Sequence, residues 1–520
     1  MPAVSGVMDR ADAAEPVLLS GARLPGADGV FDLSLADGRV VSITPTGAAP
    51  APALAPASGA AHPRRIELDG RYVVPGLHDR HVHASQWAMV SRRLDLAAAA
   101  SAAEVAALVA ASVDRGQAEV IGFGYRDGLW PDAPSRRLLD AVSGEVPVVL
   151  VAADLHACWL NSAAARRHGV AELAGDAGVL REDDCFALVR ELDDLADDVL
   201  DGWVGEAADR AARRGVVGIT DYEMRWNRDD WARRAARGIR SLRVSFGIYT
   251  QHLDRAITDG LRSGDLVEGT GGLVSVGSYK VITDGSLNTR TAWCFDPYPG
   301  LEGHEHAHGV ATVPYDELVP LMRTAVEAGL TPAVHAIGDR ANARVLDAFE
   351  ALGSAGWARR GSIEHAQLLR REDVARFARL CVIASVQPEH AMDDRDVADR
   401  YWPGRTDRAF MLGGLAAAGV ELALGSDAPV APLDPWIAIA AAVGRTRDGR
   451  QPWHPEQAIE ARAALAASTG GAGHTVQAGA VADLAVLDLD PFTASADALR
   501  RMPVAATLLA GALTHDALGG

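Results

Sequence analysis

The sequence predicts an α/β protein: a (β/α)8 TIM-type barrel, with a small β-sandwich domain formed by both termini and a subdomain inserted into the barrel. Short apolar segments alternate with Ala-, Arg- and Glu-rich helical segments through the middle of the chain. Repeated strand–helix units imply a parallel sheet, which closes most simply into a barrel. The rival is an open doubly wound sheet, but no G-x-G-x-x-G motif follows a predicted strand.

The two ends of the chain are rich in short strands. We expect these strands at residues 17–20, 31–35, 40–43, 66–69, 482–488 and 504–509. Residues 47–63 are rich in alanine and proline, which indicates a loop or a flexible insertion. We therefore assign residues 1–72 and 478–520 to one composite β-sandwich domain and residues 73–477 to the barrel.

The middle of the chain supplies the strands and helices of the barrel. Predicted strands include residues 216–220, 330–335, 361–365 and 420–425, and predicted helices include 315–328, 341–352 and 372–380. In barrels of this kind the catalytic groups lie at the carboxyl ends of the strands. The residues that follow each predicted strand are therefore the first candidates for a functional site.

The composition favours a small molecule as the partner. The 520 residues carry a formal net charge of −19, which disfavours nucleic acid and anionic membranes because both attract basic surfaces. The four cysteines are scattered without a C-x-x-C pair, which suits a reducing compartment. The chain has neither a recognisable N-terminal signal sequence nor an apolar run long enough to span a bilayer. We expect a cytoplasmic protein without a membrane partner, and a homodimer is compatible with the sequence.

Side chains that can bind metal ions follow several of the predicted strands. His81 and His83 end an apolar strand that begins at residue 73, and their spacing of two places both on one side of that strand. The other candidates lie at or near the ends of four further predicted strands: Lys280, His335, His365 and Asp427. Neutral imidazole and carboxylate groups suit zinc and similar divalent ions. An isolated H-x-H pair is weak evidence, but the ordered set predicts a metal centre.

Lys280 is the only lysine among the 50 basic side chains. An unmodified ammonium group repels cations, and arginine cannot replace lysine where the amine must lose its proton. After reaction with CO2, a lysine becomes a carbamate with two oxygens and a negative charge. Such a group could bridge two metal ions about 3.5–4 Å apart. This chemistry gives a specific reason for lysine at this position.

These positions, in their order and surroundings, resemble the amidohydrolase superfamily of metal-dependent hydrolases, in the branch that contains N-substituted formamide deformylase. The matching segments extend over nearly the whole chain: VPGLHDRHVH (74–83), DGSLNTRTA (284–292), HAIGDRA (335–341), IEHAQ (363–367), SVQPEH (385–390) and GSDAP (425–429). As a set, these segments are highly specific.

The resemblance implies a binuclear metal centre. In this superfamily pattern His81 and His83 bind one metal ion, and His335 and His365 bind the other. Lys280, carboxylated by CO2, bridges the two ions, and Asp427 ligates the first. The implied metals are two zinc ions per chain, with manganese, iron or cobalt as alternatives.

The stretch between His83 and Lys280 is longer than the barrel requires. Three strand–helix units need about 100 residues at roughly 30 residues each, and the chain provides nearly twice that length here. The surplus predicts an inserted subdomain within about residues 91–205. The acidic helical segment 182–201 is its best candidate, and we expect it to shape substrate access.

Four residues are predicted to contact the substrate: His156, Trp159, His390 and Asp284. His156 and Trp159 lie near a predicted strand end, where the deformylase branch usually reads Asp-Gly-His and this chain has leucine at position 155. Core packing explains these two equally well. His390 ends the segment SVQPEH, and Asp284 begins the segment DGSLNTRTA.

Two further signals have competing explanations. His304, His306 and His308 could form a metal-binding tract, but their Gly- and Pro-rich surroundings favour an exposed or lid loop. Asp339 could orient a histidine ligand, or it could form a structural salt bridge with an arginine.

The expected function is hydrolysis of a C–N bond in a small amide, formamide or carbamate by a metal-activated hydroxide. Asp427 would act first as general base and then as general acid, and His156 would help to stabilise the tetrahedral intermediate. Ester hydrolysis stays open for the same site. The alternatives are a mononuclear deaminase of the same superfamily, which would not need Lys280, and a noncatalytic regulatory protein with the same fold.

Overall fold

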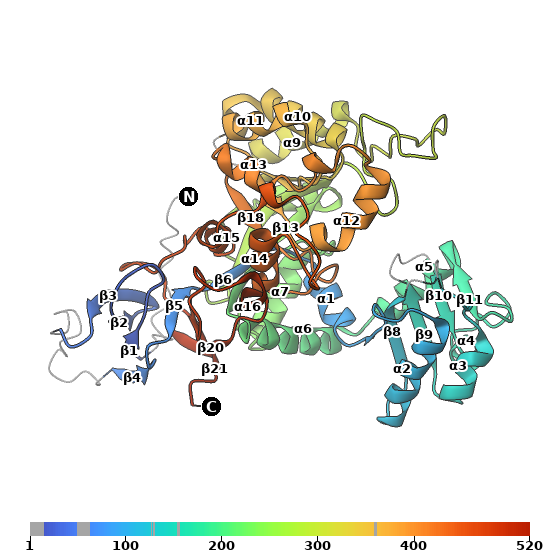
Figure 1. Cartoon of the computed structure of the whole chain (residues 1–520), viewed down its shortest axis with the longest axis horizontal. Coiled ribbons are helices and arrows are strands. Elements are labelled where there is room, and N and C mark those ends of the chain that lie inside the picture. Colours follow the sequence, from blue (N-terminus) through green and yellow to red (C-terminus); the bar gives the residue numbers. More distant parts are fainter. Residues whose placement is uncertain are drawn as a thin grey trace. The chain divides into compact units, whose positions relative to one another are not determined.

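The computed structural model describes residues 15–48, 63–125, 127, 130–152, 157–357 and 361–519. The chain divides into two compact units, one made of Met1–Ala84 with Gly205–Gly520 and the other of Ser85–Val204. An eight-stranded sheet dominates the first unit, and a five-stranded sheet forms the centre of the second. Figure 1 traces the chain through these elements from blue to red.

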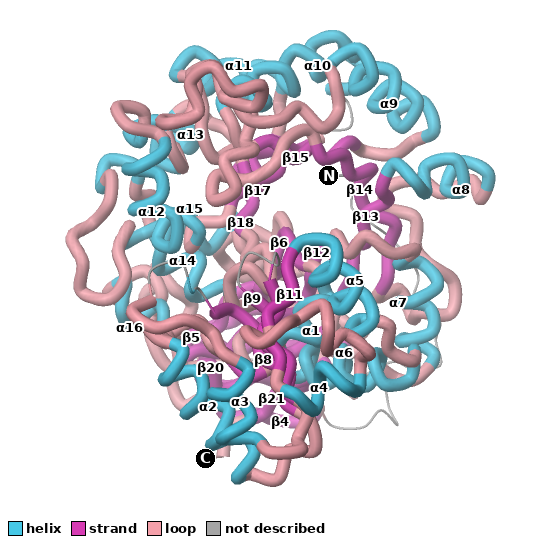
Figure 2. The backbone as a smooth tube through the Cα atoms, turned by 90° about the vertical axis from the view of Figure 1, so that its right-hand side faces the viewer, coloured by secondary structure: helices cyan, strands magenta, loops and turns pink. Residues whose placement is uncertain are grey.

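The eight parallel strands of the first unit form a barrel. In spatial order they are β6 (Leu77–Val82), β12 (Val216–Asp221), β13 (Arg243–Tyr249), β14 (Val274–Ile282), β15 (Pro332–Ala336), β16 (Ser362–His365), β17 (Ile383–Val386) and β18 (Leu422–Leu424). The ring closes just beyond β6 and β18, where the His83 N–H donates to Ala428 O and the Asp427 N–H donates to His81 O, each at 2.8 Å. Figure 2 shows the strands arranged around the barrel centre. The predicted TIM-type barrel is confirmed.

Helices alternate with these strands around the barrel. The predicted helix at residues 315–328 is α9 (Tyr315–Ala328). Asp316 and Glu317 lie in its first turn, where their negative charges interact favourably with the helix dipole. It ends at Gly329, whose φ of 95° is a left-handed conformation that favours glycine. The other two predicted helices fall within α10 (Asp339–Trp357) and α11 (Arg371–Leu380).

Strands from both ends of the chain form the predicted β-sandwich. One sheet has the order β3 (Arg39–Pro45), β2 (Phe31–Ala36), β1 (Val17–Ala22), β4 (Arg64–Glu67), and the other has the order β21 (Ala512–Asp516), β20 (Val504–Leu509), β19 (Leu484–Leu487), β5 (Tyr72–Pro75). Leu19 and Leu33 of the first sheet share one apolar core with Leu484 and Leu508 of the second. Figure 1 shows the blue and red strands in the same part of the molecule. Residues 49–62, most of the predicted Ala- and Pro-rich loop, lie outside the described residues.

The strand expected to run on from residue 73 is two strands in two different sheets. β5 pairs antiparallel with β19 of the sandwich, whereas β6 pairs parallel with β12 of the barrel. The chain passes from one sheet to the other at Gly76, where an added Cβ would lie 2.5 Å from a methyl group of Val217. Glycine is required there because the barrel packs directly against this connection. The terminal sheets therefore include β5, beyond the expected boundary at residue 72.

The second unit has a sheet of its own. Its strands have the order β11 (Val179–Arg181), β10 (Ala157–Leu160), β9 (Val148–Ala152), β8 (Val120–Tyr125), β7 (Leu94–Asp95), with helices α2 (Ala102–Asp114), α3 (Arg136–Ser143), α4 (Ser162–Arg167) and α5 (Glu182–Asp193). The acidic segment 182–201 supplies α5 and the first turn of α6 (Asp197–Ala212). Cys158 and Cys185, which form no motif in the sequence, have their sulfur atoms 2.9 Å apart in the core of this unit.

The remaining helices belong to the barrel unit or join the two units. They are α1 (Ala84–Val90), α7 (Asn227–Ala236), α8 (Leu253–Thr258), α12 (His390–Tyr401), α13 (Leu412–Ala417), α14 (Pro435–Gly444), α15 (Ala461–Ala467) and α16 (Ala496–Arg500). Among the helices of the described residues, none combines the length and apolar character needed to cross a membrane.

Candidate metal centre

The six predicted metal ligands come from five strands of the barrel. They are His81 in β6 and His83 just after it, Lys280 in β14, His335 in β15, His365 at the end of β16 and Asp427 after β18. The parallel register places His335 beside Ile282 of β14 and His365 beside Ala336 of β15, so the side chains from these strands lie at similar heights. The fold therefore gathers these groups at the carboxyl end of the barrel.

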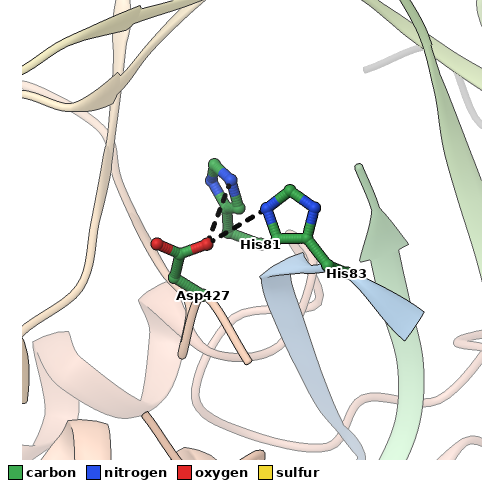
Figure 3. A group of neighbouring side chains, drawn as sticks. All are labelled: His81, His83 and Asp427. Atoms are coloured by element: carbon green, nitrogen blue, oxygen red, sulfur yellow. Dashed lines mark ion pairs between the residues drawn. The ribbon is translucent and has the colours of Figure 1, made fainter. Parts of the chain in front are cut away.

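His81, His83 and Asp427 form the first cluster. The Nε2 atoms of His81 and His83 lie 3.6 and 3.3 Å from Asp427 Oδ1. Figure 3 shows both imidazole rings beside this carboxylate. All three side chains offer ligand atoms within 4.8 Å of one another, a spacing that can hold a metal ion.

The backbones that carry the first cluster approach each other closely. A Cβ added to Gly425 would lie 2.7 Å from the backbone nitrogen of His81, so only glycine fits at this contact. Asp79 Oδ1 accepts hydrogen bonds from the N–H groups of His81 and Ser426, at 3.2 and 2.9 Å. Burial raises the pKa of Asp79 to about 6, against the opposing effect of the hydrogen bonds from Ser426. These contacts fix the strand ends from which His81 and Asp427 project.

A second cluster shares Asp427 with the first. The ligand atoms of His365, His390 and Asp427 also lie within 4.8 Å of one another. His365 stacks on His390 with ring centres 6.3 Å apart, and the ring of His335 meets His365 edge to face at 4.5 Å. His365 and Asp427 have φ values of 74° and 57°, which are strained for residues other than glycine. Each strand therefore ends in a turn that sets the direction of its ligand.

His390 is held in place through its neighbour Glu389. The Glu389 carboxylate is buried and accepts hydrogen bonds from Arg447 at 2.8 Å and from both terminal nitrogens of Arg500 at 2.9 Å. These charge-assisted bonds fix the start of α12, whose first residue is His390.

Lys280 is buried among these groups. Its Nζ lies 4.3 Å from the centre of the Tyr222 ring and has no hydrogen-bond partner among the described residues. Burial lowers the pKa of Lys280 to about 8, although Glu364 and Asp427 oppose the shift. A neutral amine is therefore accessible near physiological pH, unlike in an exposed lysine.

His81, His365 and Asp427 have the charge states that a metal ion requires, whereas, against the effect of burial, the hydrogen bond and charge of Asp427 raise the pKa of His83. Burial lowers the pKa of His81 to about 4 and that of His365 well below its ordinary range, so both imidazoles are neutral at pH 7. Burial alone would raise the pKa of Asp427, but His81, His83 and His365 hold it well below its usual value. Neutral imidazoles around an anionic carboxylate are a fitting donor set for a divalent cation.

Unsatisfied polar atoms in this region also fit a bound group. Within the described part of the chain, the buried atoms without a hydrogen-bond partner include His83 Nδ1, Lys280 Nζ, His365 Nδ1 and His390 Nε2. Buried polar atoms are normally paired, because an unpaired one costs about 1–3 kcal/mol. Their concentration at one end of the barrel marks the place where ligands could be held.

Glu364 is a site residue to which the sequence analysis gave no role. Its Oε2 lies 2.8 Å from His81 Nδ1, and both side chains are buried. Burial alone would raise the pKa of Glu364, but Lys280 and His81 lower it to about 2. One signal could have identified it: a carboxylate inside a short barrel strand is rarely buried without a partner.

Comparison with known proteins identifies the family. Residues 64–515 match the Amidohydrolase family. The chain belongs to this family. The described fold and the clustered histidines agree with that assignment.

Three proteins illustrate the relatives of this amidohydrolase. It is 29% identical to Protein LONG AFTER FAR-RED 3 of Arabidopsis thaliana, over 78% of this chain and 74% of the relative. It is 28% identical to YtcJ of Bacillus subtilis (strain 168), over 88% of this chain and 92% of the relative. It is 26% identical to N-substituted formamide deformylase of Arthrobacter pascens, over 89% and 92%. The predicted resemblance to the deformylase branch is confirmed.

A solved structure has the same fold as this amidohydrolase. An uncharacterized metal-dependent hydrolase from Pyrococcus horikoshii OT3 superposes with a TM-score of 0.75, covering 93% of this chain and 99% of the other. Its sequence identity is 23%, so the likeness concerns the architecture.

The two predicted substrate contacts in the barrel unit, His390 and Asp284, differ from each other in their surroundings. His390 is itself a member of the second cluster. Asp284 is fully buried, and its carboxylate accepts hydrogen bonds from the N–H groups of Trp293, Ile337 and Gly338 at 2.8–3.0 Å. Because these protein groups occupy both oxygens, the structure gives Asp284 a supporting position instead of a surface for substrate.

The other two predicted substrate contacts, Trp159 and His156, belong to the second unit. Trp159 is completely buried in the apolar core of its own unit, against Tyr125, so core packing is the interpretation that the structure supports. His156 lies outside the described residues.

The structure shows the surroundings of the two remaining signals. His304 and His306 lie in an exposed loop, and neither candidate ligand cluster contains a residue of the 303–308 tract. Asp339 accepts a hydrogen bond from the Phe295 N–H at 2.9 Å and pairs with Arg408 at 3.4 Å. Of the two explanations for Asp339, the structure shows the arginine salt bridge.

Proposed function

We propose that this chain is a metal-dependent hydrolase that cleaves a C–N bond in a small amide, formamide or carbamate. The observation that carries the proposal is the convergence of histidine imidazoles, one carboxylate and the only lysine at the carboxyl end of a closed barrel. The family assignment supports it, and so does the similarity to a relative named as a formamide deformylase.

The residues suit a pair of divalent ions. His81, His83 and Asp427 would hold one ion, and His335 with His365 would hold the other. Carboxylated Lys280 would lie between them, with zinc as the metal and manganese, iron or cobalt as alternatives. When bound, such ions lower the pKa of a water molecule towards 7 and polarise a carbonyl group.

The proton transfers would be carried out by Asp427. Its carboxylate would accept a proton from the attacking water and later donate that proton to the nitrogen of the departing amine. Two histidine side chains point into the same space, because the Asp427 oxygen lies near His83 and His390. His390 Nε2 has no hydrogen-bond partner among the described residues and could donate to the developing oxyanion. His156, to which the sequence analysis gave that task, lies outside the described residues.

Metal analysis combined with a substrate panel tests this function. We expect about two divalent ions per chain, together with turnover of at least one amide, formamide or carbamate by the metal-replete protein. Asp427→Asn should reduce kcat by about 10²–10⁴-fold because it removes the proton acceptor. Lys280→Arg should reduce both metal content and activity, because guanidinium cannot form the carbamate.

The outcomes separate the alternatives. One ion per chain with release of ammonia would favour a mononuclear deaminase, and a protein that binds no metal and turns over nothing would favour a regulatory role. Asp339→Asn is the control, since Asp339 is buried at the same end of the barrel but binds Phe295 and Arg408. Full metal content and activity in Lys280→Arg would disprove the bridging carbamate.

A further inference from the structure

Two buried carboxylates lie against the Nδ1 atoms of two of the candidate ligand histidines. Glu364 Oε2 is 2.8 Å from His81 Nδ1. Asp284 Oδ1 is 3.1 Å from His335 Nδ1, a close contact whose present ring orientation does not make a hydrogen bond. The exposed fraction of each carboxylate is 1% or less, so water does not compete for these contacts.

Glu364 reaches His81 across the inside of the barrel. β17 and β18 separate their strands, β16 and β6, in the sheet. The other carboxylate oxygen, Oε1, accepts a hydrogen bond from Ser362 Oγ at 2.5 Å and lies 3.4 Å from the Tyr222 hydroxyl. These partners fix the carboxylate before any ligand arrives.

Asp284 is fixed by backbone groups. It follows β14 and accepts from the N–H groups of Ile337 and Gly338, which directly follow the strand that carries His335. The Trp293 N–H binds the same carboxylate from the loop after β14. Asp284 therefore ties the ligand strand to its neighbour and presents one oxygen to the histidine ring.

A carboxylate beside Nδ1 determines which ring nitrogen remains free. A carboxylate only accepts hydrogen bonds, so the imidazole must carry its proton on Nδ1 and keep the Nε2 lone pair for a metal. In His81 the Nε2 atom is indeed the one that faces Asp427, at 3.6 Å. The Nδ1 atoms of His83, His335 and His365 have no hydrogen-bond partner among the described residues, but that of His335 has the Asp284 carboxylate 3.1 Å away.

We propose that Glu364 and Asp284 are positioning residues, each of which orients one histidine of one metal site. Glu364 sets His81 in the first site, and Asp284 sets His335 in the second, so each site has one fixed and one adjustable imidazole. This inference rests on the proposed function, because it assigns the two histidines to metal ions. It also replaces the expected substrate contact of Asp284 with a specific task.

Metal affinity tests the proposal independently of activity. The variants Glu364→Gln and Asp284→Asn keep the side-chain size but remove the charge. In Asp284→Asn the new amide N–H groups would also face backbone N–H groups, so donors would meet donors. Competition of the apoprotein with a chromophoric chelator for Zn²⁺ should show about 10–100-fold weaker binding of one of the two ions in each variant. The double variant should lose affinity for both ions.

The control is Asp339→Asn, which removes the charge of another buried carboxylate with a backbone N–H partner. It should bind both ions as tightly as the unchanged protein. Circular dichroism of the apoproteins checks folding, and Glu364→Asp serves if Glu364→Gln does not fold. Glu364→Asp keeps the charge but withdraws the oxygen from His81, so it should also bind one ion more weakly.

Two results would overturn the inference, and they differ in what else they overturn. If the unchanged protein binds two ions and the folded variants bind them equally well, the positioning roles are wrong but the proposed function stands. If the unchanged protein binds no divalent ion, both the positioning roles and the proposed function are wrong.

Discussion

The amine of Lys280 loses its water on folding and gains no hydrogen-bond partner among the described residues. Burial lowers its pKa from 10.5 to about 8, and the nearby carboxylates of Glu364 and Asp427 only partly oppose this shift. Below that pKa the ammonium form predominates and cannot react with CO2. Above it the amine is free, so formation of the carbamate should become easier as the pH rises through about 8.

The first prediction concerns this titration. Apoprotein in CO2-free buffer should take up Zn²⁺ slowly or incompletely, and added CO2 should restore uptake. At a fixed concentration of dissolved CO2, the extent of restoration should increase between about pH 7 and pH 9, because the neutral fraction of the amine increases. Zinc uptake and a carbamate signal from ¹³C-labelled CO2 measure the two events separately.

Lys280→Arg provides the comparison for this prediction. Its guanidinium stays protonated over the whole pH range, so CO2 should neither label the protein nor change its metal uptake. Two outcomes would contradict a carbamate on Lys280. One is labelling of the variant to the same extent as the unchanged protein, and the other is metal uptake by the unchanged protein that does not depend on CO2.

Single residues differ in how far the sequence could predict them. His81 and His83 could be paired because alternation along a strand places residues two apart on the same side. Glu364 could not be paired with His81, because their contact depends on the closure of the barrel between β6 and β18. His390 was predicted near the pocket, but its anchoring through Glu389 depends on Arg447, in the loop after α14, and on Arg500 of α16, whose packing the sequence does not state.

At the scale of elements, helix α12 joins the candidate site to the outer part of the barrel. Its N-terminal residue His390 approaches His365 and Asp427, while the preceding Glu389 is bound by Arg447 and by Arg500 of α16. The Arg500 contact is bidentate, and the Glu389 side chain is only 5% exposed. The position of His390 therefore depends on an ion pair made outside the candidate site.

Removal of one partner of the Glu389–Arg500 ion pair should lower the free energy of unfolding. Arg500→Ala leaves Glu389 buried with Arg447 as its remaining cationic partner among the described residues, so we expect a loss of about 1–3 kcal/mol in the free energy of unfolding. Urea denaturation followed by circular dichroism measures the change. The matched control is Arg379→Ala, whose partner Glu350 is 51% exposed; it should cost at most about 1 kcal/mol. Equal losses in the two variants would contradict a structural role for the Glu389 contacts.

The order of elements was more predictable than the joints between them. Apolar strands that alternate with amphipathic helices indicated the barrel, and α9 has the predicted bounds. The joint at Gly76 was not predicted, because apolar residues continue from β5 into β6 without a polar turn. An inserted subdomain was expected within about residues 91–205, with an acidic helical segment as its best candidate, but its five-stranded sheet was missed because its short strands have the same composition as those of the barrel.

At the scale of the whole molecule, the six predicted ligands belong to one of the two compact units. His81 and His83 lie in its first segment, and Lys280, His335, His365 and Asp427 lie in its second. A metal centre built from these residues would therefore connect two segments of one unit that are separated in sequence by Ser85–Val204. Bound metal ions would stabilise the folded form of this unit by mass action.

Removal of the metal ions should accordingly affect the two units differently. Hydrogen exchange measured by mass spectrometry before and after chelation should show faster exchange at the carboxyl ends of β6, β14, β15, β16 and β18, where the predicted ligands are attached. The exchange of β8 and β9, in the other unit, should stay the same, because those strands are held by their own sheet and core. Readdition of Zn²⁺ should restore the original protection in the barrel unit. Equal acceleration in β8 and β9, or none near the predicted ligands, would contradict a metal centre built from the barrel unit.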